Sequence, residues 1–315
     1  MLYKKDNPLA FFLVFGILVL ILAILPFFME LFFQTFITEI LIWVLFAISF
    51  DLIFGYTGLL SFGQALFFGV GGYTIAILIL KAGWSAGYSL LLAVLVPIVF
   101  AWFVGYFSVK LTGIHFVIIT LIFALIGSTI GETWSVTGGA DGLVFPVTPL
   151  QFGLFQVDLM DIRSNYYFVL VLAALSYLML RRIVQSPLGK VFISIRENED
   201  RAQLIGYNVQ RYKLLAFVIA GGFSGLAGGL YSLTLKYASA NFLHWSVSGH
   251  AVVYTIVGGM GTLIGPVIGT GIIMSLEHYL IKLFEGTELI IGIVLVIMVI
   301  LAPQGLIGIL KRKGK

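Results

Sequence analysis

The sequence predicts an all-α polytopic membrane protein with about ten transmembrane helices. Sixty per cent of the 315 residues are hydrophobic and 10% are charged, whereas soluble domains average about 25% charged residues. Apolar runs of roughly 18 to 22 residues, long enough to span a bilayer as helices, recur along the chain. A transmembrane β-barrel would instead show segments of about ten residues with alternating polarity. The apolar runs do not alternate in this way, so we expect helices.

Ten apolar spans are expected, and nine spans plus a re-entrant hairpin are the alternative. In chain order they are Leu9–Met29, Phe36–Phe54, Leu59–Leu80, Tyr88–Val109, Gly113–Ile130, Tyr166–Ile183, Leu214–Leu235, Val247–Gly258, Thr262–Leu283 and Leu289–Pro303. The first run could be mistaken for a signal peptide. About 21 residues at 1.5 Å each cover roughly 32 Å, however, which is a full bilayer crossing. The apolar core of a signal peptide has only about 7–15 residues.

The Lys and Arg residues predict how the chain is oriented, because cytoplasmic loops carry an excess of them. With ten crossings and the N-terminus inside, 14 of the 18 basic residues fall on the cytoplasmic side and 4 on the other. The sequence therefore predicts a multi-pass protein of the inner (plasma) membrane with both termini in the cytoplasm. Residues 1–315 form one transmembrane domain, with an extracytoplasmic loop at 131–165 and a cytoplasmic loop at 184–212. The outer loop is either a solvated cap or a docking surface for an extracytoplasmic partner.

Two glycine-dense stretches interrupt the apolar pattern. GYTGLLSFGQALFFGVGGY begins at Gly55, and VGGMGTLIGPVIGTG begins at Val257. Each glycine costs a helix about 1 kcal/mol relative to alanine, so this density needs a reason. Paired interrupted spans in the two halves of a transporter indicate a translocation pathway, whereas close helix packing through small residues is the alternative. The expected pathway or hinge residues are Gly55, Tyr56, Gly58, Ser61, Gly63, Gln64, Gly258, Gly259, Gly261 and Gly265.

Sequence signatures of enzymes and of nucleotide binding are missing. The chain has no cysteine, and its four histidines show no metal-ligand spacing. Gly189–Lys190 is followed by Val191, whereas a phosphate-binding loop needs Ser or Thr at that position. We therefore expect no catalytic residue, no metal and no cofactor in this chain. The net charge of +4 is attributed to membrane orientation and not to nucleic-acid binding.

Few ionisable residues lie well inside the expected spans. Asp51, His250 and Glu277 are among them, and a charge in the membrane is costly enough to make each a functional candidate. A proton-coupled pump would need a relay of such groups across several spans, which the sequence does not show. Structural or pathway-lining roles are therefore favoured.

The stretch from Arg181 to Lys213 is the one long basic passage, with seven basic and three acidic residues. An apolar side of a short helix is expected from Phe192, Ile195, Ala202, Leu204 and Ile205, and a polar side from residues 196–201. Gly206 can end this helix in the left-handed conformation. Such a helix across the ends of the spans could receive a push from a soluble protein, and an ordinary solvated loop is the alternative.

Three motifs carry a resemblance to a known family. IRENEDRAQLIGYNVQRYKLLAFVIAGGFSGLAGGLYSL resembles the cytoplasmic loop and following helix of branched-chain amino acid permeases of ATP-binding-cassette (ABC) importers. GYTGLLSFGQALFFGVGGY and VVYTIVGGMGTLIGPVIGTG resemble stretches near the start and end of the same family. The similarity covers roughly Phe36 to Pro303, and the M-type subunit of the Liv system is the better fit. The family often has Ala-Ala-Glu where this chain has Arg201–Ala202–Gln203.

The resemblance implies a permease half for branched-chain or other hydrophobic amino acids. Its partners would be a second permease subunit, two cytoplasmic ABC ATPases that bind the ATP, an extracytoplasmic solute-binding protein and membrane lipid. The residues expected to couple the permease to the ATPase are Arg196, Glu197, Asn198, Glu199, Asp200, Arg201, Ala202 and Gly206. Related permeases for urea, short-chain amides or sugars are the alternative with the same machinery. An ion-coupled secondary transporter or channel and a membrane-embedded enzyme are alternatives of other classes.

Overall fold

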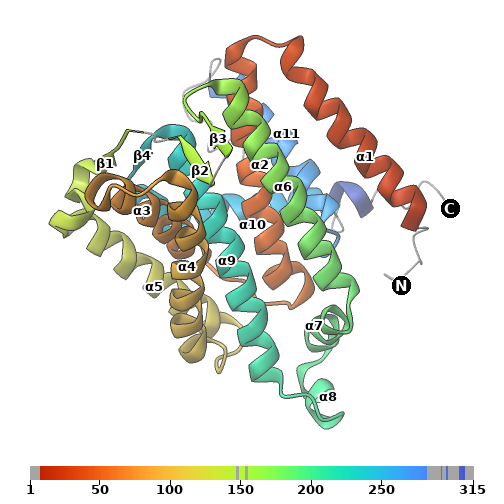
Figure 1. The fold of residues 1–315 in the computed structure, drawn as a ribbon. Helices are drawn as coiled ribbons and strands as arrows, with labels where there is room; N and C mark the ends of the chain where they lie inside the picture. Colours follow the sequence, from red (N-terminus) through yellow and green to blue (C-terminus); the bar gives the residue numbers. More distant parts are fainter. Residues whose placement is uncertain are drawn as a thin grey trace.

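Long helices make up most of the protein (Figure 1). The computed structural model describes residues 8–146, 149–152, 155–281, 292, 296 and 305–308. In this part of the chain, six helices are long and apolar enough to cross a membrane. They are α2 (Leu31–Asp51) with its π-helical extension η2 (Leu52–Tyr56), α3 (Gln64–Ala82), α4 (Ala86–Ser108), α5 (Ile114–Thr133), α6 (Ile162–Gln185) and α9 (Val209–Leu235). The predicted all-α class is confirmed, and the number of about ten spans stays a prediction.

Three more of the helices that the structure describes are shorter than these six. They are α1 (Pro8–Ile24, followed by the 3-10 turn η1, Leu25–Phe27), α10 (Trp245–Gly258) and α11 (Ile264–Ile281). The 14 residues of α10 cover about 21 Å, less than the roughly 30 Å hydrocarbon core of a bilayer. The tenth predicted span, Leu289–Pro303, lies outside the described residues apart from 292 and 296.

The centre of the bundle is a close crossing of α9 with α3 and α4. A Cβ atom on Gly228 would lie 1.8 Å from the Phe68 carbonyl oxygen, and one on Gly71 would lie 2.1 Å from the Gly225 carbonyl oxygen. Gly225 also faces Pro97 of α4, whose ring would lie 2.3 Å from a Cβ at that position. Small residues allow helix backbones to approach this closely in membranes. Glycine therefore sets the packing distance at the middle of the molecule.

The two ends of the bundle differ. At one end, which we call the β end, β1 (Leu143–Val144) pairs antiparallel with β4 (Tyr237–Ala238), and β2 (Leu150–Phe152) pairs with β3 (Phe155–Val157). The 3-10 turns η3 (Ser135–Thr137), η4 (Gly139–Asp141) and η5 (Ala240–Leu243) adjoin these strands along the chain. At the opposite end, which we call the α8 end, α7 (Pro187–Glu197) and α8 (Glu199–Leu204) lie at the foot of the bundle (Figure 1).

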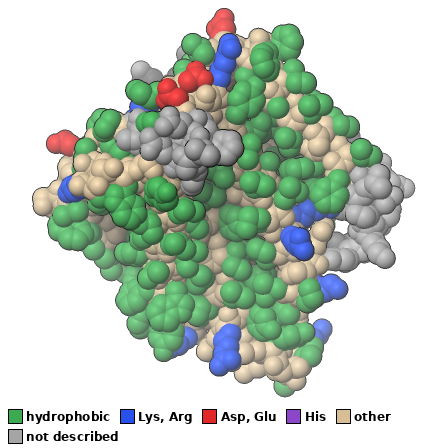
Figure 2. Space-filling model, in the orientation of Figure 1, with side chains coloured by type: hydrophobic (Ala, Val, Ile, Leu, Met, Phe, Trp, Pro, Cys, Tyr) green, Lys and Arg blue, Asp and Glu red, His purple; other side chains and the backbone are tan. Residues whose placement is uncertain are grey.

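The surface between the two ends is largely apolar (Figure 2). Figure 2 shows hydrophobic side chains covering the sides of the bundle, with Lys and Arg gathered toward the α8 end and Asp and Glu toward the β end on this face. On α4, Phe100, Trp102 and Phe103 are exposed. An apolar belt between polar ends is the surface expected of a protein that sits in a bilayer.

The start of α3 differs from the sequence prediction for a local reason. The predicted span Leu59–Leu80 begins five residues late, because α2 runs through the π-helix η2 and residues 57–63 are not helical. Gly58 has φ +80°, which is a left-handed conformation that side chains other than Gly rarely adopt. It therefore turns the chain before α3 begins at Gln64.

Candidate coupling site

The predicted cytoplasmic loop 184–212 folds as two helices and not one. Asn198 is extended, with φ −163°, and its side-chain Oδ1 accepts a hydrogen bond from the Arg201 backbone N–H at 2.8 Å. Asparagine is a preferred N-cap, so α7 ends and α8 begins at this residue. The expectation of one short helix is therefore wrong, because the segment forms two helices that meet at Asn198. The α7 helix returns against the end of α6, where a Cβ on Gly189 would lie 2.0 Å from the Val184 carbonyl oxygen.

The predicted end of the helix at Gly206 is confirmed. Gly206 has φ +100°, its N–H donates to the Gln203 carbonyl at 2.9 Å, and the Tyr207 N–H donates to the Ala202 carbonyl at 3.2 Å. These two bonds form the Schellman arrangement that satisfies the last carbonyls of a helix. The α8 helix is thus fixed at both ends by local hydrogen bonds.

The residues predicted to form one apolar side of this segment do not share one environment. Ile195 and Ala202 are buried in a small cluster with Val191 and Val209, whereas Leu204 is 87% exposed and Ile205 is 68% exposed. The expectation of one continuous apolar side is therefore wrong, because the chain breaks at Asn198 and turns again at Gly206. The C-terminal end of α8 consequently exposes two aliphatic side chains, Leu204 and its neighbour Ile205.

An ion pair that the sequence analysis missed fastens α8 to α9. Lys213 Nζ lies 2.5 Å from Glu199 Oε2. The Lys213 side chain is 2% exposed, and that of Glu199 is 38% exposed. A buried ammonium group needs such a partner, since an unpaired buried charge is costly. No periodic spacing links two residues on different helices, so only the basic character of this passage hinted at the pair.

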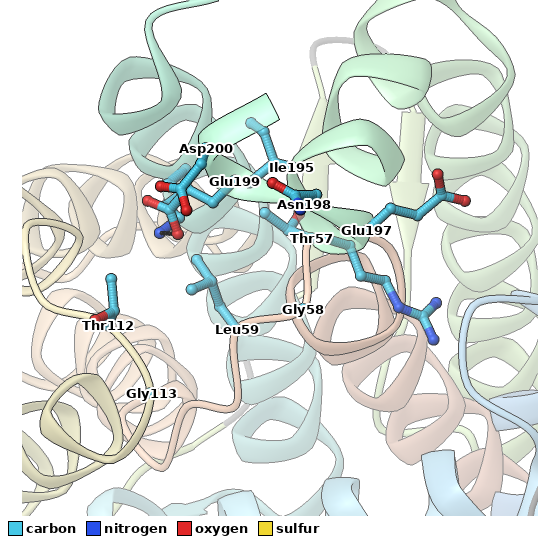
Figure 3. Close-up of a pocket in the computed structure, with 12 residues that line it drawn as sticks. Thr57, Gly58, Leu59, Thr112, Gly113, Ile195, Glu197, Asn198, Glu199 and Asp200 are labelled. Carbon is cyan, nitrogen blue, oxygen red and sulfur yellow. Dashed lines mark hydrogen bonds and ion pairs between the residues drawn. The ribbon is translucent and has the colours of Figure 1, made fainter. Parts of the chain in front are cut away.

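A cleft of about 330 Å³ opens beneath α7 and α8 (Figure 3). Its wall is built from residues 195–200 on one side, and from Thr57–Leu59, Thr112–Gly113 and Lys213 on the other sides. Glu199 and Asp200 lie together on the side facing Thr112, whereas Glu197 points away from them. Within the described ranges, no group of three His, Asp or Glu side chains is placed to hold a metal ion.

The last basic residue of α7 joins both glycine-dense stretches. Arg196 Nη1 donates a short hydrogen bond to the Gly55 carbonyl oxygen. A Cβ on Gly58 would lie 3.1 Å from Arg196 Cγ, and one on Gly261 would lie 2.8 Å from Arg196 Nη1. Residues about 200 positions apart in the sequence thus meet at one guanidinium group at the α8 end.

Asp51 links the same two stretches from inside. Its carboxylate is fully buried. Oδ1 accepts from the Gly261 N–H at 2.7 Å, and Oδ2 accepts from the Leu263 N–H at 3.1 Å. The sequence singled out Asp51 only as an ionisable residue within a span. Its partner could not be predicted, because the turn between α10 and α11 is distant in the chain.

The other expected pathway residues lie within the body. Gly258 and Gly265 face each other across the α10–α11 turn, where a Cβ on Gly258 would lie 1.8 Å from the Gly265 carbonyl oxygen. Gly259 turns the chain with φ +116°. Tyr56, Ser61, Gly63 and Gln64 are buried. The Gln64 Oε1 atom accepts from the Ser224 hydroxyl at 2.8 Å. The structure thus brings Gly55, Gly58 and Gly261 together at Arg196, and it places the rest in tight turns or in the core.

Comparison with known proteins identifies the family. The model of the branched-chain amino acid transport system permease component matches residues 32–302. This chain belongs to that family. It is therefore a permease component and not an enzyme, and the six long apolar helices found among its described residues make it a multi-pass membrane protein.

Individual relatives differ in the transport system that their names state. The permease is 27% identical over 300 residues to the high-affinity branched-chain amino acid transport system permease protein LivM of Escherichia coli (strain K12), covering 88% of this chain and 70% of LivM. It is 24% identical over 287 residues to LivH of the same strain, covering 84% and 91%. It is 34% identical over 126 residues to the xylose transport system permease protein XylH of Haemophilus influenzae (strain ATCC 51907), covering 38% and 33%. No solved structure matches the chain.

Proposed function

We propose that this permease is one membrane subunit of an ABC importer for branched-chain or other hydrophobic amino acids. It works with a second permease subunit, two cytoplasmic ATPases that bind the ATP, and an extracytoplasmic solute-binding protein that delivers the substrate. The subunit lies in the inner (plasma) membrane with both termini and the α8 end in the cytoplasm. The family match over residues 32–302 and the basic α8 end (Figure 2) support this assignment.

The α8 helix carries exposed apolar side chains and is itself held in place by an ion pair, and this arrangement is the main support for the proposal. Leu204 and Ile205 are exposed beside residues 196–201, five of which are charged, and α8 is held by the Lys213–Glu199 pair. Exposed aliphatic side chains within a charged rim are the composition of a protein interface. A rigid base lets a displacement of α8 pass to the bundle without being absorbed by a loose loop.

The coupling residues then divide their work. Glu197, Asn198, Asp200 and Arg201 are exposed and contact the ATPase. Ala202 is buried and seats α8 on the body, and Gly206 ends the helix so that Leu204 and Ile205 project. Arg196 and Glu199 face the bundle through the Gly55 carbonyl and Lys213, and they pass the movement inward. The glycines at 55–63 and 258–265 act as hinges beside the pathway.

Substitution of the exposed aliphatic pair tests the docking role. In the Leu204→Asp/Ile205→Asp variant of the assembled importer, ATP-driven uptake of radiolabelled leucine should be lost, and the ATPase should no longer co-purify. Val144→Asp is the matched control for co-purification of the ATPase, because Val144 is 73% exposed at the β end, away from α8. Unchanged uptake and co-purification in the α8 variant would contradict the proposal.

A sugar importer is the second candidate, since part of the chain is 34% identical to the xylose permease protein XylH. The two candidates differ in cargo and share the machinery. Mass spectrometry of the ligand bound to the co-purified solute-binding protein separates them: a branched-chain amino acid supports the first candidate, and a pentose supports the second. Uptake by this subunit alone, independent of ATP, would contradict both.

A further inference from the structure

The turn between α10 and α11 has a backbone that needs support from outside. Gly259 and Gly261 have φ +116° and +73°, and Leu263 has φ +56°. A left-handed backbone at a residue with a branched side chain such as Leu is unfavourable, and it persists only where the surroundings impose it. Leu263 is buried, and the Leu263 N–H donates to Asp51. The Thr262 side chain holds the turn from within, through the Gly259 carbonyl and the Gly265 N–H. The carboxylate of Asp51 is the group that holds it from α2.

The end of α2 fits against this turn at atomic contact. A Cβ on Gly55 would lie 1.9 Å from Asp51 Oδ1 and 2.4 Å from the Gly261 nitrogen. Any residue larger than glycine at position 55 would separate α2 from the turn. The backbone of α2 at Gly55 and the backbone of the turn at Gly261 therefore meet directly beside the Asp51 carboxylate, with no other side chain between them.

The same contact extends outward to α7. Arg196 donates to the Gly55 carbonyl oxygen, and Gly55 follows Asp51 by four residues, which is about one helical turn. A π-helix spans this interval, and such irregular turns often mark functional sites in helices. Arg196, Gly55, Asp51 and the N–H groups of Gly261 and Leu263 thus form one continuous series of contacts from α7 to the turn.

We propose that Asp51 is the positioning residue that transmits movement of α7 to the α10–α11 turn, with Arg196 as its outer contact. The inference rests on the proposed function, in which α7 and α8 move with an ATPase. Two carboxylate oxygens hold two N–H groups at once. An Asn side chain offers one acceptor oxygen and turns an NH₂ group toward the second N–H, so Asn at position 51 breaks one of the two bonds.

Spin labels can follow α7 and the α10–α11 turn separately. This chain contains no cysteine, so engineered cysteines are unique in it and can be labelled before the importer is assembled. Two doubly labelled variants are needed. The first carries Lys190→Cys on α7 and Val144→Cys at the β end, and it reports the distance from α7 to the β end. The second carries Met260→Cys in the turn and the same Val144→Cys, and it reports the distance from the turn to the β end. In the complete importer reconstituted in liposomes, both distances should shift on addition of ATP with vanadate. In Asp51→Asn, the α7 distance should still shift, and the shift of the turn should be lost.

Two further variants keep the test decisive if Asp51→Asn folds poorly. Arg196→Gln removes the outer contact without changing the buried carboxylate, and it should also abolish the shift of the turn. Asp51→Glu keeps both acceptor oxygens, and the turn in this variant should show part of the wild-type shift. A wild-type α7 that does not shift with nucleotide overturns the proposed function. If α7 shifts with nucleotide and the turn still moves in Asp51→Asn or Arg196→Gln, the proposed role of Asp51 is overturned, and the proposed function is not.

Discussion

The middle of the bundle and its α8 end use glycine for opposite purposes. At the α3–α9 crossing, Gly71 and Gly228 are helical, and they bring two backbones into contact. At the α8 end, Gly58 and Gly261 have left-handed backbones and lie against Arg196. The first arrangement fixes a distance between helices, and the second lets short segments turn around a charged side chain. Glycine density alone therefore does not distinguish a rigid core from a hinge.

The largest effect is expected in the core. Gly228→Ala places a methyl group 1.8 Å from the Phe68 carbonyl oxygen, so the helices must separate, at a cost of about 3 kcal/mol. The variant should lose most of its folded protein when detergent extracts are heated and analysed by size-exclusion chromatography. Gly249→Ala in α10 is the control, since nothing lies within 4 Å of its Cβ position. Equal stability of the two variants would contradict close packing at Gly228.

The ion pair at the α8 end should respond asymmetrically. Glu199→Gln leaves the buried Lys213 ammonium without its charged partner, whereas Lys213→Met leaves Glu199, which is 38% exposed and can be solvated. Glu199→Gln should therefore lower stability by roughly 2 kcal/mol, and Lys213→Met should lower it less. Thermal denaturation of the purified complex measures both. The double variant should recover stability over Glu199→Gln, and additive losses would contradict a direct pair.

The turn glycines should affect transport more than folding. Gly261→Ala forces a left-handed backbone on alanine, which costs about 1–2 kcal/mol, and it adds a methyl group 2.8 Å from Arg196 Nη1. The importer should assemble, and uptake of leucine per ATP hydrolysed should fall. Gly271→Ala, with open space at its Cβ position, should leave that ratio unchanged. A normal ratio in Gly261→Ala would show that this turn is not a hinge.

The smallest effect is expected at the end of α8. Gly206 has φ +100° and open space at its Cβ position, so Gly206→Ala costs only the backbone strain, about 1 kcal/mol. Asn tolerates this conformation better than Ala, and Gly206→Asn should lie between Ala and wild type in its affinity for the ATPase. Surface plasmon resonance with the purified ATPase gives that order, and identical affinities would contradict the C-cap role.

The sequence predicted the long helices well because their apolar runs are continuous. The expected span Tyr88–Val109 corresponds to α4, Ala86–Ser108. The α6 helix starts earlier than expected, at Ile162, because the residues that extend it beyond the apolar run are polar. The Asp161 side chain accepts from the Ser164 N–H and caps that extension.

The sequence predicted several residues of the candidate site, but it did not predict the contacts between them. Arg196, Gly55 and Gly261 were all named from the sequence, but their meeting depends on tertiary contacts between distant segments. The Lys213–Glu199 pair and the hydrogen bonds of Asp51 were missed for the same reason. The break at Asn198 was missed because a capping asparagine within a charged run resembles ordinary helix surface in sequence.

The central claim is that α8 is the surface that meets the ATPase. The most direct measurement is photo-crosslinking in cells with p-benzoylphenylalanine at position 204, compared with the same probe at position 144 of the β end. The account predicts that mass spectrometry of the position-204 adduct identifies an ABC ATPase, and that the position-144 adduct contains none. An ATPase adduct at position 144, or none at position 204 in an importer that transports leucine, would contradict it.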